Sequence, residues 1–266
     1  MPTKEEIKEY WSKMAKQDCQ SPVSLLPIRY LGTHRDYNLQ HLEMTTLLKY
    51  LNGNEEILDV GCGKGYTSLY LVFKKHVSIF GLDYSQPMIR EANQIKDEFT
   101  ADYTLSGRLE YMEGDILDFK DSNSFDIVYS ERCLINIPTW EEQKKAIDVL
   151  TQVVKKDGLL LLFEGSQQGL IKLNHLRDRY GLGDIMVVWY NLFLDDSILV
   201  EYASKSFELV EINNFCSTYM VISRVLHPAL VSPREPEYND RINDLALRLP
   251  NHGDFSYLKL YVFRKK

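Results

Sequence analysis

Apolar runs and amphipathic stretches alternate along residues 54–165, and this alternation predicts strands separated by helices. The runs that we assign to strands are Glu56–Val60, Val77–Asp83, Leu109–Gly114, Phe125–Glu131 and Gly158–Glu164. A parallel sheet covered by helices on both faces has this order of elements. The pattern therefore predicts an α/β fold for this part of the chain.

Two helices between these strands have a clear apolar face. Ser85 is expected to cap the first helix, whose buried positions are four, three and four residues apart: Met88, Ala92, Ile95 and Phe99. The second helix is expected to start near Thr139 and to stop at Lys155–Gly158, after apolar groups at Ile147, Leu150 and Val154. Both helices fit between strands of the predicted sheet.

The flanking segments are less regular, and we interpret them as additions to a single domain that spans residues 1–266. Its core is residues 36–165, and residues 166–206 and 216–255 are two insertions, the first with a helix near Leu170–Tyr180. Phe207–Phe215 reads as a strand, and Tyr257–Phe263 as a closing strand at the sheet edge.

Residues 1–35 are expected to carry an N-terminal helix over residues 4–17. Its apolar positions form one stripe, made of Ile7, Tyr10, Trp11 and Met14. Such a stripe fits either packing on the domain surface or a lid over a pocket, and the sequence leaves both interpretations open.

The first strand ends in the acid Asp59 and is followed by glycines at alternate positions, Gly61, Gly63 and Gly65. Glycine has no Cβ, so this loop can adopt positive φ and let a ligand lie against bare backbone at the start of a helix. The spacing is G-x-G-x-G, whereas dinucleotide-binding proteins use G-x-G-x-x-G, and no P-loop pattern is present. The loop predicts a nucleotide-like ligand.

Two further acids follow predicted strands. Asp83 ends the second strand, where a carboxylate can accept hydrogen bonds from both hydroxyls of a ribose. The alternative for Asp83 is a helix cap, but Ser85 is better placed for that role. Asp115 follows the third strand and precedes the apolar residue Ile116.

The acid, the glycine spacing and the order of Asp83 and Asp115 resemble class I S-adenosylmethionine-dependent methyltransferases. The resemblance implies a Rossmann-like, seven-stranded, mostly parallel sheet flanked by helices, with a small helical cap from the insertions. It implies S-adenosylmethionine as cofactor and S-adenosylhomocysteine as product. Asp115 would accept from the adenine amino group, Ile116 would cover the ring, and the backbone of Ser130 and Glu131 would hold the methionine part. The residues that we expect to bind the cofactor are Tyr10, Trp11, Asp59, Gly61, Cys62, Gly63, Gly65, Asp83, Tyr84, Ser85, Met88, Asp115, Ile116, Ser130 and Glu131.

The acceptor site is expected to come from the fourth and fifth strand ends and from the insertions. The catalytic candidates are Glu131, Arg132, Glu164, His175 and Arg177. For an alcohol acceptor the base would be Glu131, Glu164, His175 or His252, although each histidine has the competing role of a packing or surface residue. Arg132 and Arg177 could bind an anionic acceptor, and Glu131 and Arg132 could instead form a mutual ion pair.

Four short strings widen the resemblance: E-R-C-L-I-N-I, L-N-H-L-R-D-R-Y-G-L, W-Y-N and L-P-N-H-G-D-F-S. They look like a bacterial subgroup of methyltransferases associated with capsule and surface-polysaccharide gene clusters, including phosphoramidate-modifying ones. This implies an acceptor oxygen on a sugar, a nucleotide-linked or a phosphoramidate-type precursor. The alternatives are a regulator that binds the cofactor without chemistry and an NAD-dependent oxidoreductase.

The composition of the chain limits the classes of molecule that it is expected to bind. A net charge of −7 and a pI of about 5.5 argue against nucleic acid, which requires a basic face, and favour a small-molecule acceptor. Cys19, Cys62, Cys133 and Cys216 have no metal-site or disulfide spacing, which indicates no metal and a cytoplasmic protein. The charged N-terminus lacks a signal sequence, and the aliphatic run Leu159–Phe163 is too short to span a membrane. No feature specifies an oligomeric state.

Overall fold

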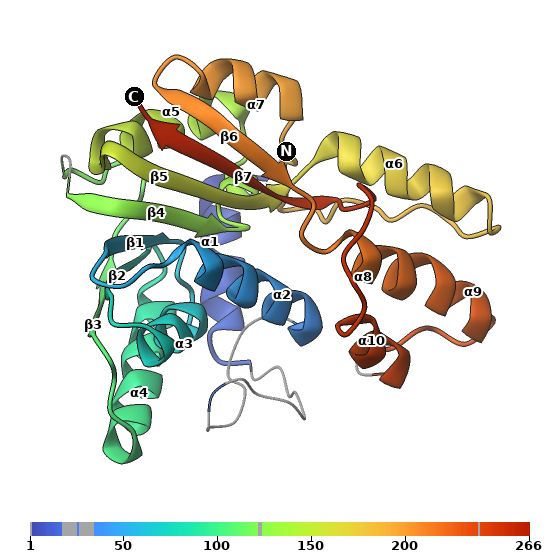
Figure 1. Cartoon of the computed structure of the whole chain (residues 1–266), viewed down its shortest axis with the longest axis horizontal. Helices are drawn as coiled ribbons and strands as arrows, with labels where there is room; N and C mark the ends of the chain where they lie inside the picture. Colours follow the sequence, from blue (N-terminus) through green and yellow to red (C-terminus); the bar gives the residue numbers. More distant parts are fainter. Residues whose placement is uncertain (1, 18–25, 27–34, 122–123, 239) are drawn as a thin grey trace.

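The computed structural model describes residues 2–17, 26, 35–121, 124–238 and 240–266. Within them, seven strands form one sheet in the order β3-β2-β1-β4-β5-β7-β6 (Figure 1). Strands β1 to β5 are parallel to one another, and β7 is antiparallel to both β5 and β6. The predicted Rossmann-like, mostly parallel sheet is therefore confirmed. The bounds are β1 Glu56–Val60, β2 Ser78–Asp83, β3 Arg108–Glu113, β4 Phe125–Glu131, β5 Val154–Gly165, β6 Phe207–Asn213 and β7 Leu258–Lys265.

The last strand does not lie at the sheet edge, and that prediction is wrong. β7 lies between β5 and β6, so that Tyr261 pairs with Leu162 on one side and with Ile212 on the other. Residues 258–263 are all buried, as an interior strand requires, whereas most side chains of β6 are exposed. The edge strand on this side of the sheet is therefore β6.

Helices cover both faces of the sheet. Alternate residues of β1 belong to different cores: Ile57 packs with α2 and α3 on one face, and Leu58 packs with α5 and α7 on the other. Such two-sided burial is typical of parallel sheets. The helices are α1 Lys4–Met14, α2 Tyr37–Leu47, α3 Tyr66–Lys74, α4 Gln86–Asp102, α5 Trp140–Val153, α6 Gln167–Asp178, α7 Asp196–Ala203, α8 Ser217–Val221, α9 His227–Val231 and α10 Arg241–Ala246.

Two helix ends differ from expectation. Ser85 occupies the N-cap position of α4, but its hydroxyl lies 3.0 Å from the Ser12 hydroxyl and does not cap the helix. α5 begins after the capping residue Thr139, as predicted, yet it ends at Val153, because Val154 already pairs with Phe125 as part of β5. The segment Lys155–Gly158 is therefore an irregularity inside β5, where the register to β4 shifts, and not a helix stop.

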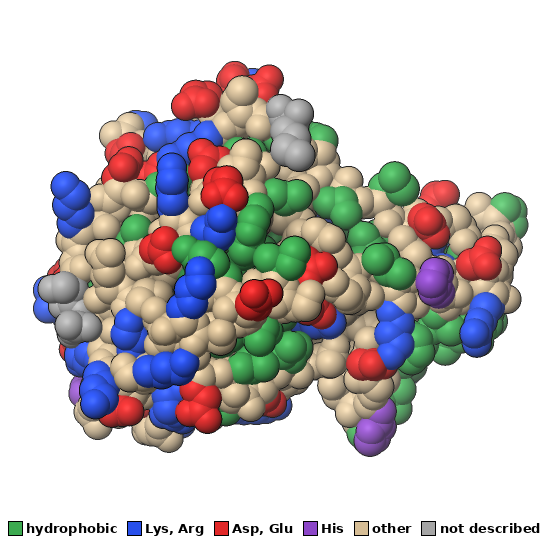
Figure 2. Space-filling view, turned by 90° about the horizontal axis from the view of Figure 1, so that it is seen from above, with side chains coloured by type: hydrophobic (Ala, Val, Ile, Leu, Met, Phe, Trp, Pro, Cys, Tyr) green, Lys and Arg blue, Asp and Glu red, His purple; other side chains and the backbone are tan. Residues whose placement is uncertain are grey.

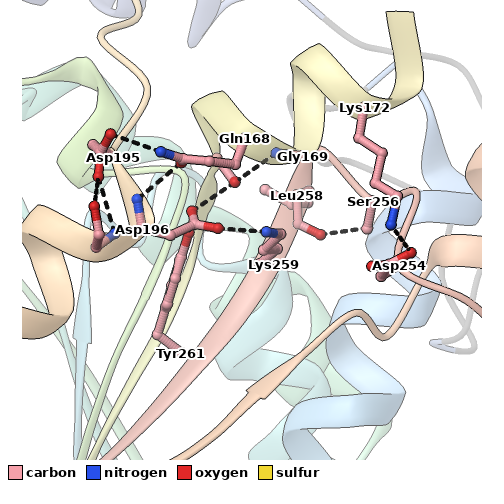
Figure 3. A network of polar contacts seen from close by, with 12 residues as sticks. Gln168, Gly169, Lys172, Asp195, Asp196, Asp254, Ser256, Leu258, Lys259 and Tyr261 are labelled. Carbon is pink, nitrogen blue, oxygen red and sulfur yellow. Dashed lines mark hydrogen bonds and ion pairs between the residues drawn. The ribbon is translucent and has the colours of Figure 1, made fainter. Parts of the chain in front are cut away.

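Four helices of the insertions, α6, α8, α9 and α10, lie near one another beyond one end of the sheet (Figure 1), whereas α7 packs with α5 against a face of the sheet. Asp196, the first residue of α7, fastens the first insertion to β7, and Figure 3 shows Lys259 and Tyr261 pointing toward it. Its carboxylate lies 2.5 Å from Lys259 Nζ and accepts from the hydroxyls of Tyr261 and Ser166, each at 2.6 Å. In the described part of the chain no helix has both the length and the apolar character to cross a membrane.

Candidate functional site

A cavity of about 600 Å³ lies beyond the carboxyl ends of β1 to β4, where open α/β sheets bind their ligands. Each strand end contributes residues to its lining, among them Gly61 and Gly63 after β1, Asp83 and Tyr84 at the end of β2, Asp115 and Ile116 after β3, and Glu131 and Arg132 at the end of β4. Helix α1 and the segment around residues 185–191 complete the wall. The sheet order therefore brings together the residues that the sequence singled out.

The glycine loop has the backbone conformation that only glycine adopts easily. Gly61, Gly63 and Gly65 have φ of 76°, 53° and 70°. A Cβ on Gly61 would lie 2.6 Å from Cys133 Sγ, and one on Gly65 would collide with the Tyr111 hydroxyl, which donates to the Gly65 carbonyl at 2.8 Å. Bare backbone thus faces the cavity and leads directly into α3, as a ligand cradle requires.

Asp83, at the end of β2, is hydrogen-bonded to the glycine loop. Its two carboxylate oxygens accept from the Gly63 N–H at 2.9 Å and from the Ser85 N–H at 2.8 Å. Burial raises the pKa of Asp83 to about 6, although the two backbone hydrogen bonds and Lys8 oppose the shift. Each oxygen still has capacity for a second donor, so the two hydroxyls of a ribose fit this carboxylate.

Asp115 has a partner that the sequence did not indicate. Its carboxylate forms an ion pair with Lys4 of α1 and accepts from the Leu117 N–H at 3.0 Å. Ile116 is buried and lines the cavity, where a flat ring can pack against it. Lys4 therefore shares the carboxylate that we expect to bind the adenine amino group.

Five of the predicted cofactor residues do not line the cavity: Asp59, Cys62, Gly65, Ser85 and Ser130. Asp59 accepts from the Ser68 hydroxyl, and burial raises its pKa to about 7. Burial also raises the pKa of the Cys62 thiol, which agrees with a small loop residue and not with a nucleophile. Tyr10, Trp11 and Met88 do line the cavity.

Helix α1 covers the cavity and touches the first insertion. The Tyr10 ring stacks on Tyr190, with centroids 4.7 Å apart, and its edge meets Trp189. The Trp11 indole N–H donates to Asn136 Oδ1 at 3.1 Å. Residues 18–25 and 27–34 of the predicted N-terminal segment, including Cys19, lie outside the described residues.

Glu164 was expected to be catalytic, and the structure gives it another role. It does not line the cavity, and its carboxylate accepts from the Ser130 hydroxyl and from three backbone N–H groups, those of Cys133, Leu134 and Ile135, at 2.7 to 3.2 Å. Burial raises its pKa to about 7 despite these donors. Glu164 thus fixes the loop after β4, and a base with its lone pairs so occupied is poorly placed to accept a substrate proton.

Two more catalytic candidates lie away from the cavity. His175 is exposed on α6, and Arg177 donates to the carbonyls of Gly183, at 2.8 Å, and Arg224. His252 is also exposed and does not line the cavity. These residues follow β5 or β6 in sequence, but the insertions turn their side chains elsewhere. Of the catalytic candidates, Glu131 and Arg132 remain in the cavity wall.

Several polar residues of the acceptor end come from segments that sequence reasoning had not singled out. Glu43, on α2, is fully buried, and one of its oxygens lies 3.2 Å from Arg132 Nη2. Arg224 lines the cavity and pairs with Asp36, whose other oxygen accepts from the Tyr219 hydroxyl at 2.6 Å. A carboxylate four residues from both Leu39 and Leu47 was the available signal for Glu43.

Comparison with known proteins agrees with this geometry. Residues 58–162 match the family Methyltransf_11, a methyltransferase domain. A probable methyltransferase, ltbC, from Aspergillus luteorubrus is 30% identical over 147 residues, which are 53% of this chain and 50% of that protein. The tRNA N(3)-methylcytidine methyltransferase trm140 of Schizosaccharomyces pombe is 25% identical over 179 residues, 64% of this chain and 56% of that protein. The chain thus spans about half the length of these curated relatives.

Among solved structures, the magnesium protoporphyrin IX methyltransferase ChlM from Synechocystis PCC 6803, with bound S-adenosylhomocysteine, has the same fold. The TM-score is 0.61 at 16% identity, and the match covers 99% of this chain and 100% of that one. Residues 58–162 thus match a methyltransferase domain, and the sheet order agrees with a Rossmann-like fold. S-adenosylmethionine is the cofactor of such a domain.

Proposed function

We propose that the protein is an enzyme that transfers a methyl group from S-adenosylmethionine to an oxygen of a small polar acceptor. The observation that carries the proposal is the composition of one cavity. Its nucleotide end has Gly61, Gly63, Asp83 and Asp115, and its other end has arginines and aromatic side chains from α1 and the insertions. Donor and acceptor would thus meet in one enclosed space.

Bound S-adenosylmethionine supplies a methyl group on a sulfonium, a good leaving group. The acceptor oxygen forms a bond to the methyl carbon while the carbon–sulfur bond breaks, and S-adenosylhomocysteine leaves with the electron pair. Alignment of the two reactants can lower such a barrier by about 7–11 kcal/mol. The protein therefore needs to orient the acceptor more than to activate it.

A base is needed only when the acceptor oxygen arrives protonated. Glu131 lines the cavity, and one of its carboxylate oxygens is buried with no hydrogen-bond partner among the described residues. Burial raises its pKa, which makes the carboxylate a better proton acceptor. For an alcohol acceptor, Glu131 would receive the proton. A phosphate-like oxygen is already anionic and needs no base.

The acceptor that we propose is a sugar, nucleotide-linked or phosphoramidate-type precursor of a surface polysaccharide. Two of the four strings that resemble the polysaccharide-associated subgroup line the cavity, namely those at residues 131–137 and 189–191. The strings at residues 173–182 and 249–256, all of which the structure describes, contribute no residue to its wall. The cavity-lining strings support this class of acceptor.

A small acceptor is proposed in preference to nucleic acid, although one relative is a tRNA methyltransferase. The chain carries a net charge of −7, and Figure 2 shows acidic and basic side chains interspersed around a central group of hydrophobic ones. Binding of a nucleic acid backbone requires a continuous basic surface. Helix α1 also covers the cavity, which suits a compact substrate. The reduced cysteines Cys62, Cys133 and Cys216 favour a cytoplasmic location.

Transfer of a deuterated methyl group tests the proposal. The protein is incubated with trideuteromethyl S-adenosylmethionine and with sugars, nucleotide sugars, phosphoramidates or bulk tRNA, and products are analysed by mass spectrometry. A mass shift in one small-molecule pool supports the proposal, and labelled tRNA would overturn the acceptor class. Cofactor binding with no transfer to any pool would favour a regulator, and binding of NAD in its place would favour an oxidoreductase.

A further inference from the structure

Arg132 occupies an unusual position at the end of β4. Its backbone is left-handed, with φ of 55°, a conformation that costs a non-glycine residue free energy and is often found at functional sites. Two contacts hold it there: the Arg132 N–H donates to the Phe163 carbonyl at 2.8 Å, and the Asn136 side chain donates to the Arg132 carbonyl. The surrounding loop thus imposes the direction in which this side chain points.

The guanidinium of Arg132 is only partly used by the protein. Its side chain is 20% exposed and lines the cavity, and Nη2 lies 3.2 Å from Glu43 Oε2. Nη1 is buried and has no hydrogen-bond partner among the described residues. A buried charged donor without a partner is costly, so its persistence in a cavity wall indicates a ligand with acceptor atoms.

The carboxylates of Glu43 and Glu131 face Arg132, but they do not use all of its hydrogen-bond donors. Burial raises the pKa of both carboxyl groups, Glu43 and Glu131. Glu43 approaches Nη2 without forming a hydrogen bond. The positive charge of Arg132 therefore remains available to the cavity.

A second arginine points to the same end of the cavity. Arg35 lines the wall, and the charges of Arg132 and Arg35 both act on the Tyr190 hydroxyl, where they oppose the rise in its pKa caused by burial and by a hydrogen bond with Tyr10. Both guanidinium groups therefore lie near Tyr190. Two arginines at one place provide more positive charge than the single carboxylate of the cofactor needs.

Arg224, the third arginine of the cavity wall, differs in this respect. Its Nη2 pairs with Asp36, and its guanidinium lies over the Tyr238 ring, 4.8 Å from the centroid. This pairing neutralises Arg224 within the protein. Arg132 and Arg35 are the arginines better placed to meet an anion.

We infer that the acceptor carries an anionic phosphate or carboxylate group, which Arg132 binds through its guanidinium and Arg35 binds from the cavity rim. A planar guanidinium matches the oxygens of either group. The inference rests on the proposed function, because it concerns the acceptor end of the same cavity. It makes Arg132 the residue that selects charged acceptors over their neutral counterparts.

Binding to the protein saturated with S-adenosylhomocysteine tests the inference. Calorimetry with glucose 1-phosphate, glucuronate and glucose separates phosphate, carboxylate and neutral sugar. We expect one or both anions to bind and glucose to bind at least about tenfold more weakly, the loss expected when hydrogen bonds between charged groups are absent. Equal binding of all three, or binding of none, would overturn the inference.

Substitutions of Arg132 and Arg35 test whether these residues bind the anionic group. Arg132→Gln should weaken binding of the anionic sugar by about 10-fold to 100-fold, and Arg132→Lys, which keeps the charge but loses the planar fork, by less. Arg35→Gln, at the exposed rim, should also weaken binding of the anionic sugar. This variant leaves the contact between Arg132 and the buried Glu43 intact, so its effect does not depend on that contact. Arg179→Gln, on the exposed end of α6, is the matched control and should bind like the unaltered protein.

S-adenosylhomocysteine affinity distinguishes the remaining outcomes. Arg132→Gln should leave it within about threefold of the unaltered protein, well under the loss of a charged hydrogen bond. A selective loss of cofactor affinity in this variant would show that Arg132 binds the cofactor carboxylate and would overturn the inference. No cofactor binding by the unaltered protein would contradict the proposed function itself.

Discussion

At the scale of single residues, Asp83 links the glycine loop to the cavity. It holds Gly63 and Ser85 through their backbone N–H groups and faces the cavity with the remaining capacity of each oxygen. The same carboxylate therefore shapes the loop and would receive the ribose. A neutral side chain at this position would form weaker hydrogen bonds, both to the loop N–H groups and to the ribose hydroxyls, because it carries no negative charge.

Replacement of Asp83 by alanine should weaken S-adenosylhomocysteine binding by about 1–3 kcal/mol, the usual loss for hydrogen bonds to a charged group. Calorimetry with the purified variant measures this difference. Asp178→Ala, which removes an exposed acid at the end of α6, should bind the cofactor like the unaltered protein. Unchanged affinity in Asp83→Ala would show that the ribose lies elsewhere.

At the scale of secondary-structure elements, α1 makes contact with three strand ends at once. Lys4 pairs with Asp115 after β3, Ser12 meets Ser85 after β2, and Trp11 donates to Asn136 after β4. We propose that α1 acts as a lid that closes over the bound cofactor. A capping box formed by Thr3 and Glu6 stabilises the N-terminal end of α1 through contacts within the helix.

The variant Trp11→Ala tests the lid. Loss of the indole hydrogen bond and of its aromatic contacts should weaken S-adenosylhomocysteine binding by about 1–2 kcal/mol and speed its release. Lys13→Ala, on the exposed side of the same helix, should change neither quantity. If Trp11→Ala leaves affinity and release rate unaltered, α1 merely packs on the surface.

The attachment of the first insertion depends on Asp196. Asp196→Ala would leave the largely buried Lys259 without its ion-pair partner (Figure 3), and we expect the free energy of unfolding to fall by about 3 kcal/mol. Its neighbour Asp195 caps α7 and accepts from the exposed Gln168 side chain, so Asp195→Ala should cost about 1 kcal/mol. Urea denaturation measures both. Equal losses would show that the Asp196–Lys259 pair adds nothing beyond a cap.

The elements that sequence predicts well are those with local signals. The strand that ends in Asp59 and the glycine loop are adjacent in the sequence, so the motif that they form can be recognised from the sequence alone. The acceptor end has no such signal, because Glu43 and Arg224 reach it from α2 and from the second insertion. Glu164 illustrates the limit: its position after a strand was predicted, but its backbone partners depend on how the following loop folds.

At the scale of the whole molecule, the protein buries several acids at the strand ends. Asp59, Asp83 and Glu164 have pKa values raised by burial to about 7, 6 and 7. This arrangement costs stability in the free protein once the acids ionise. A bound ribose and a cationic sulfonium would compensate part of that cost, which is the expected character of a site built for a ligand.

The pH dependence of stability follows from these acids. In the unfolded chain they lose their protons near pH 4, whereas the folded protein retains them up to about pH 6–7. The folded state therefore holds more protons in this window, and its free energy of unfolding should fall as pH rises from about 5 to about 8. Acids with lowered pKa, such as Asp126, have ionised in both states by then.

Urea denaturation of the ligand-free protein at several pH values measures this trend. Glu164→Gln removes one of the titrating groups and should make the dependence shallower. Stability that rises between pH 5 and pH 8 would contradict the assigned burial of these acids.

The central claim is that the cavity at the carboxyl ends of β1 to β4 binds S-adenosylmethionine. Isothermal titration calorimetry of the unaltered protein with S-adenosylmethionine, and separately with NAD, tests it most directly. The structure predicts saturable heat with the first ligand, at one site per chain, and none with the second. No heat with S-adenosylmethionine, or saturable heat with NAD alone, would contradict the account.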